Sequence, residues 1–181
     1  MNLLRRTMMF APAAVLLCQR QSAWAQMETL TAANVVRITS QLVTSGQPPA
    51  ASLATLGALG FQSVINLALT TSRDAVADEA AILQRQGIEY VHLPIEFSNP
   101  TAEDFDQFVA ALNGMRERKV LVHCQVNLRA SSFVFLYRIL VLKEPAESSY
   151  EAVAKVWSPR EPWKGLMVAQ LRKHEIAFEP Y

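Results

Sequence analysis

The chain has 181 residues, of which 51% are hydrophobic and 18% charged, with six Gly and nine Pro. This composition is typical of one globular domain and excludes a disordered or repeat-built protein. The formal net charge of +1 is too small for a dedicated nucleic-acid-binding protein, and no run of Lys or Arg creates a local basic patch. The longest apolar stretches, near 7–18 and 130–142, are shorter than the roughly 20 residues of a membrane-spanning helix. We therefore expect neither a nucleic-acid partner nor stable membrane insertion.

The first 25 residues have the layout of a secretory signal peptide. Met1–Arg6 carries two arginines, Thr7–Cys18 is almost wholly apolar, and Ala23-Trp24-Ala25 resembles a cleavage site. A buried N-terminal helix is the alternative, which Pro12 disfavours. We expect 1–25 to be removed, leaving one domain over 26–181 that is periplasmic or secreted and keeps Cys124 as its only thiol.

Apolar periodicity predicts strands that alternate with helices along the chain. A helix starting at Thr101, with Thr101 as N-cap and Asp104 as the third helical residue, carries its apolar residues at helical spacing. The other expected elements are strands at 35–39, 42–44, 61–67, 90–93 and 120–122, and helices at 48–59, 74–86 and 133–142. This alternation predicts an α/β fold with a mostly parallel central sheet flanked by helices.

Cys124 lies between the last predicted strand and the apolar helix that follows it. At such a position main-chain N–H groups and the positive end of the helix dipole favour a thiolate and form an anion cradle. Arg129, five positions later, adds a planar charged fork for a tetrahedral oxyanion. Nucleophile, amides and guanidinium together predict attack on phosphorus, although a free Cys also packs as a small buried hydrophobe.

His123-Cys124, followed by Arg129 and Ser131, resembles the signature loop of the cysteine-dependent protein tyrosine and dual-specificity phosphatases. Three further segments are similar, in order and spacing, to a bacterial branch of dual-specificity-like phosphatases. They are Ser45–Pro48, Gly60–Leu67 and Tyr90–Pro94. The resemblance implies a cysteine-phosphatase-like fold that acts on a phosphorylated protein or a small phosphate ester, without a cofactor or metal.

The loop departs from that pattern because four residues, not five, separate Cys124 from Arg129. Asn127 stands where the pattern has Gly, and Asn tolerates the left-handed backbone that a tight loop demands. Either the loop keeps its full length with Arg129 one position early on the helix, or it is one residue shorter. The shorter loop is similar to that of rhodanese-type sulfurtransferases, which hold a persulfide on Cys. A module that binds an oxyanion or a phosphoprotein with little turnover is the third hypothesis.

The resemblance also suggests roles for the other residues of the site. Glu96 is the carboxylate nearest to the place of the family's general acid, 28 residues before Cys124, with Asp104 and Asp106 as rivals and no dedicated acid as a further alternative. The candidate binding residues of the loop are His123, Gln125, Val126, Asn127, Leu128 and Ser131. His123 is expected to steady the loop, and Ser131 either assists breakdown of a phosphocysteine or caps the helix. For Trp157 and Trp163 we expect core packing rather than a place at the substrate.

Overall fold

The structure is a computed structural model that describes residues 29–181. The predicted signal peptide at 1–25 lies outside the described residues. Five strands form one sheet in the order β1-β2-β5-β3-β4, and only β1 runs antiparallel to its neighbour. The strands are β1 (Val36–Arg37), β2 (Leu42–Ser45), β3 (Ser63–Asn66), β4 (Glu89–His92) and β5 (Val120–His123).

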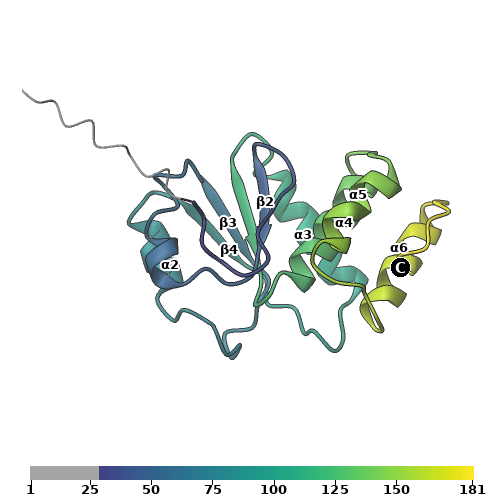
Figure 1. The fold of residues 1–181 in the computed structure, drawn as a ribbon, viewed down its shortest axis with the longest axis horizontal. Coiled ribbons are helices and arrows are strands. Elements are labelled where there is room, and N and C mark those ends of the chain that lie inside the picture. The colour runs from purple at the N-terminus through teal and green to yellow at the C-terminus, as the bar shows by residue number, and fades with distance from the viewer. Residues whose placement is uncertain (1–28) are drawn as a thin grey trace, which may run out of the picture.

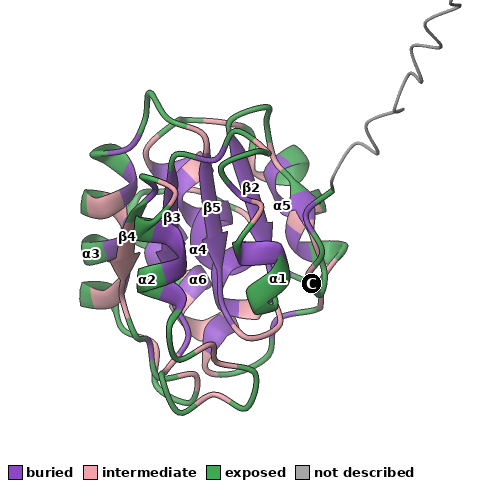
Figure 2. Cartoon of the chain, turned by 90° about the vertical axis from the view of Figure 1, so that its left-hand side faces the viewer, coloured by how far each residue is buried: buried purple, intermediate pink, exposed green. Residues whose placement is uncertain are grey.

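Helices cover both faces of the sheet (Figure 1). One layer contains α1 (Ala50–Leu53) and α2 (Glu79–Gln84), and the other contains α3 (Ala102–Asn113), α4 (Leu128–Leu140), α5 (Ala146–Ala154) and α6 (Trp163–Lys173). Alternate strand residues pack into the two layers: Leu121 joins the cluster of α1 and α2, whereas Val122 joins that of α3 to α6. The central strands are therefore buried on both sides (Figure 2), and the predicted α/β class is confirmed.

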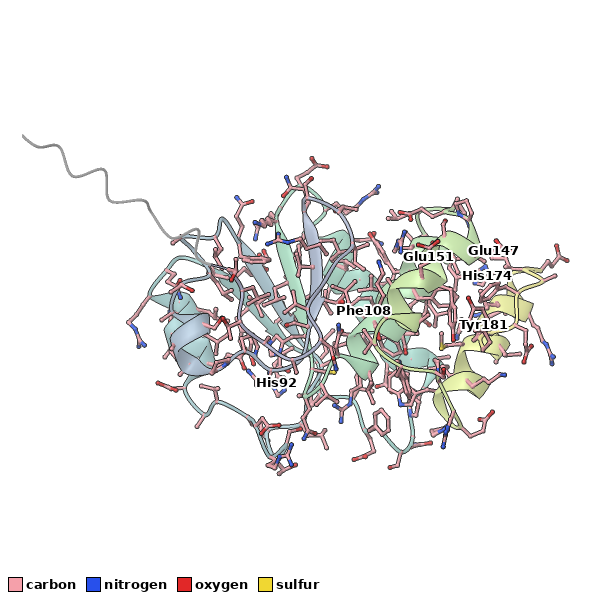
Figure 3. The ribbon with its side chains drawn as sticks, in the orientation of Figure 1. His92, Phe108, Glu147, Glu151, His174 and Tyr181 are labelled. Carbon is pink, nitrogen blue, oxygen red and sulfur yellow. The ribbon has the colours of Figure 1, made fainter. Side chains whose placement is uncertain are left out.

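Helix α3 begins as the sequence predicts. The Thr101 side chain accepts a hydrogen bond from the Asp104 N–H, and the Asp104 carboxylate accepts one from the Thr101 N–H. The helix packs on α4 through Phe108, whose ring lies 5.5 Å from that of Phe133, in the core between the two helices (Figure 3). Helix α4 is buried around most of its circumference, as its apolar sequence indicates.

Two predicted helices are shorter than expected, and two helices escaped prediction. The segments 48–59 and 74–86 contain only α1 and α2, because much of each forms turns closed by short-range bonds such as Ala75 N–H to Ser72 C=O. Helices α5 and α6 follow the apolar helix α4. Within residues 29–181 no helix combines the length and the apolarity that crossing a bilayer requires.

The sheet register brings the carboxyl ends of four strands into one row. His123 pairs with Ser45 on one side and with Asn66 on the other, and Asn66 in turn pairs with His92. Because Cys124 follows His123 directly, it lies at the edge where parallel sheets bind ligands.

Candidate active site

The loop from Cys124 to Leu128 turns the chain from β5 into α4 at Asn127. Asn127 has a φ of 74°, in the left-handed region, which confirms the prediction made from its residue type. Its buried amide donates to the Asn34 carbonyl at 2.6 Å and to Thr44 Oγ1 at 3.0 Å. The side chain therefore fixes a backbone conformation for which most loops need glycine.

The main-chain N–H groups of this loop remain available for an anion. The N–H of Cys124 donates to the Ser45 carbonyl, and the N–H of Gln47 donates to the Gln125 carbonyl. Val126 forms an antiparallel bridge with Gly46, and within the described chain the N–H groups of 125, 126 and 128–130 donate no hydrogen bond to a protein acceptor. They lie at or just before the positive end of α4, which is where main-chain amides can bind an anion.

Gly46 allows the β2 end to approach this loop closely. A Cβ at Gly46 would lie 2.9 Å from the Gln125 carbonyl oxygen and 3.0 Å from the Val126 Cα. Both neighbours are main-chain atoms, which cannot move aside as a flexible side chain can. Only glycine fits here without displacing the loop.

Cys124 and Arg129 line the same pocket, of about 200 Å³. Its lining consists of Phe97, Cys124, Gln125, Val126, Leu128 and Arg129. Arg129 is the second residue of α4 and only 6% exposed, so its guanidinium lies inside the protein rather than in solvent. Its Nε has no hydrogen-bond partner among the described residues and is free for a ligand. Cys124, 1% exposed, is more deeply buried than the other lining residues.

Three of the predicted binding residues do not line the pocket. Asn127 and His123 are both fully buried, and Ser131 is 2% exposed. The Ser131 hydroxyl donates to the Leu128 carbonyl at 3.2 Å, inside the helix, instead of accepting a bond from a helix N–H. These three residues are packed inside the protein, while Gln125, Val126 and Leu128 line the pocket.

Glu96 lies on the loop after β4, beside the pocket but exposed to solvent. Its carboxylate accepts hydrogen bonds from the N–H and the hydroxyl of Ser98, at 3.3 and 3.0 Å. These bonds, together with the positive charge of Arg129, lower the pKa of Glu96 below its ordinary value. Glu96 can therefore donate a proton only under acidic conditions.

Phe97 is a pocket residue that the sequence did not reveal. The Arg129 guanidinium carbon lies 5.4 Å from the centre of its ring, a cation–π contact. The ring packs against Trp163 and Trp157, and Trp163 Nε1–H donates to the Phe97 carbonyl at 2.9 Å. Trp163 is fully buried, as expected, and its contacts fix the position of Phe97, the ring that Arg129 contacts. The only sequence signal for Phe97 was its place directly after the candidate acid Glu96.

Glu79 is the second functional candidate that sequence reasoning missed. This buried carboxylate accepts hydrogen bonds from Gln47 and Asn66 and lies 2.8 Å from the ring of His123. Burial and the negative charge of Glu79 raise the pKa of nearby Tyr90 to about 12. The sequence signal was its position, three residues before Ile82 and four before Leu83, on the buried face of α2. No group of three His, Cys, Asp or Glu side chains in residues 29–181 gathers as a metal site would require.

A cysteine and an inward arginine that line one pocket, beside main-chain amides without a protein acceptor at the start of a helix, are the features of a cysteine-based phosphatase. Residues 21–161 match the family described as "DSP-PTPase phosphatase fused to NAD+ Kinase". The chain belongs to this family, and it is a cysteine-based phosphatase; the sulfurtransferase alternative is not favoured.

Solved structures agree with this assignment. A DUF442 protein from Shewanella putrefaciens CN-32 is 30% identical, with a TM-score of 0.71 over 78% of this chain and 91% of that one. TpbA from P. aeruginosa is 25% identical, with a TM-score of 0.55 over 83% and 98%. The catalytic core of S. cerevisiae SIW14 shares the fold, at 11% identity and a TM-score of 0.61 over 84% and 100%. No curated protein matches the sequence.

Proposed function

We propose that the protein hydrolyses phosphate monoesters through a phosphocysteine on Cys124. The thiolate attacks phosphorus, a sulfur–phosphorus bond forms, and the bond to the ester oxygen breaks. The N–H groups of the pocket-lining residues 125, 126, 128 and 129, together with the Arg129 fork, hold the non-bridging oxygens. Water then attacks the phosphocysteine, which releases inorganic phosphate and restores the thiolate. The convergence of Cys124, Arg129 and unpaired amides on one pocket carries this proposal.

Glu96 is our candidate for the proton that the leaving oxygen needs. It belongs to the same loop as the pocket residue Phe97, and the charge of Arg129 acts on its carboxylate. In the second step the same carboxylate would accept a proton from the attacking water. Since its pKa is lowered, this role requires that turnover be fastest at acidic pH.

Aryl phosphates, with phosphotyrosine in a protein as the natural case, are the substrate class that we propose. Phe97 supplies an aromatic wall beside the cysteine, against which the ring of an aryl ester can stack. One TpbA structure contains pTyr.

We also propose that the chain acts outside the cytoplasm. The proposal rests on its N-terminal sequence, which has the layout of a signal peptide. Mass spectrometry of the N-terminus of the exported protein tests it.

An aryl phosphate and an alkyl phosphate, assayed on the purified chain beside Cys124→Ser and Arg129→Lys, test the proposal. Phosphate release should disappear in Cys124→Ser, which keeps the shape of the side chain but lacks the nucleophile. Release that persists in that variant excludes the mechanism. Equal rates on the aryl and alkyl esters would exclude the aryl preference while leaving the mechanism intact.

A further inference from the structure

One buried carboxylate joins the carboxyl ends of three neighbouring strands beneath the catalytic loop. Glu79 is only 3% exposed. Its Oε2 accepts hydrogen bonds from Gln47 Nε2 and Asn66 Nδ2, each at 3.1 Å, and its Oε1 lies 2.8 Å from His123 Nε2. Gln47 follows β2, Asn66 ends β3 and His123 ends β5, so Glu79 reaches every strand that borders the loop.

The charge of Glu79 needs a partner, because a buried carboxylate without compensation is costly. Within residues 29–181 no Lys or Arg forms an ion pair with it. Of the groups around it, Gln47 and Asn66 are neutral, and Tyr90, which accepts from Asn66 Nδ2 at 3.1 Å, holds its proton because its pKa is raised to about 12. Among the described contacts of Glu79, only His123 can carry a positive charge.

The contact between Glu79 and His123 also has the character of an ion pair. The two atoms are 2.8 Å apart, but they lack the alignment of a ring N–H hydrogen bond. At this distance a doubly protonated ring would compensate the charge of the buried carboxylate. The other ring nitrogen, Nδ1, has no hydrogen-bond partner in the described part of the chain.

We propose that Glu79 is a positioning residue for catalysis, which acts on Cys124 by holding His123 as a doubly protonated imidazolium. Glu79 contacts Nε2, at the distal end of the ring, whereas the ring itself belongs to the residue bonded to Cys124. We therefore expect the positive ring to act on the sulfur more strongly than the more distant carboxylate does, so that the pair favours the thiolate. Gln47 extends the same cluster to the loop, because its N–H donates to the Gln125 carbonyl at 3.0 Å. The inference rests on the proposed function only in that Cys124 is the nucleophile.

The pH dependence of Cys124 alkylation by iodoacetamide tests this inference in the full chain. Mass spectrometry of the Cys124 peptide reads the reaction without phosphatase turnover and separates Cys124 from Cys18. Glu79→Gln keeps the size of the side chain and removes its charge. We expect the midpoint of the pH dependence of alkylation to rise by about one unit, so that alkylation slows by about tenfold at pH values below the wild-type midpoint. Glu89→Gln, which removes an exposed carboxylate paired with Arg118, is the matched control and should leave the profile unchanged.

A double-mutant cycle shows whether Glu79 acts through His123. In a His123→Asn background, Glu79→Gln should change the alkylation rate by less than about twofold. Alkylation of Glu79→Gln at or above the wild-type rate, or a full additive effect in the His123→Asn background, would overturn the inference. Neither result bears on phosphate release, which is measured separately on wild-type protein and decides the proposed function.

A second measurement needs no variant and stays decisive if Glu79→Gln does not fold. Imidazole ¹⁵N NMR of the wild-type chain, with His123 assigned by elimination against His92 and His174, reports the state of each ring nitrogen. Both nitrogens of His123 should carry protons at pH 7. A neutral ring would overturn the inference.

Discussion

Replacement of Asn127 tests whether its side chain and backbone together shape the catalytic loop. Asn127→Ala removes two hydrogen bonds, to the Asn34 carbonyl and to Thr44 Oγ1, and leaves a Cβ at a φ of 74°. Two such bonds contribute about 2 kcal/mol. The left-handed conformation costs a residue such as alanine about 1 kcal/mol more. We therefore expect the free energy of unfolding to fall by about 3 kcal/mol.

Asn127→Gly is the matched control for this prediction. Glycine loses the same two hydrogen bonds but adopts the positive φ without strain, so its free energy of unfolding should fall by about 2 kcal/mol. The two free energies of unfolding are measured in urea and compared at equal m-value. Their difference is the cost of placing a residue with a Cβ in the left-handed conformation. If Asn127→Ala were as stable as Asn127→Gly, the argument that the loop requires a left-handed residue here would be refuted.

Four further results are expected at the site. Arg129→Lys keeps the charge but loses the fork, so kcat/KM for an aryl phosphate should fall at least about 100-fold; a loss of only a few-fold would contradict the assigned role. Glu96→Gln should abolish the decline in kcat as pH rises through the lowered pKa of that carboxyl, and an unchanged profile would remove Glu96 as the acid. Gly46→Ala should reduce stability by about 1–3 kcal/mol, measured by urea unfolding, because its Cβ meets main-chain atoms; a neutral effect would mean that the loop can shift freely. Phe97→Ala should slow aryl phosphate hydrolysis more than alkyl phosphate hydrolysis, whereas equal losses would place the ring away from the leaving group.

Those features that depend on neighbours in the chain could be predicted. The Thr101–Asp104 cap, the left-handed Asn127 and the strand–loop–helix around Cys124 each follow from local residue types, and all are present. The inward Arg129 follows from the same reasoning, since a helix that starts just after the loop carries its first turn over the cysteine.

The residues that were missed depend on contacts between distant segments. Glu79 is separated from Gln47 by 32 positions and from Asn66 by 13, so only the sheet order brings them together. The same holds for Phe97 and Trp163, 66 positions apart. The sequence pattern does place Glu79 on the apolar face of α2, which is unusual for a carboxylate. Periodicity alone does not predict which residues form hydrogen bonds with it.

Direct detection of the covalent intermediate tests the central claim. The chain, mixed rapidly with an aryl phosphate and quenched within one turnover, is digested and analysed by mass spectrometry. A phosphoryl group on the Cys124 peptide, absent in Cys124→Ser, is the predicted result. Phosphate release from wild-type protein with no phosphoryl group on Cys124 at any quench time would contradict it.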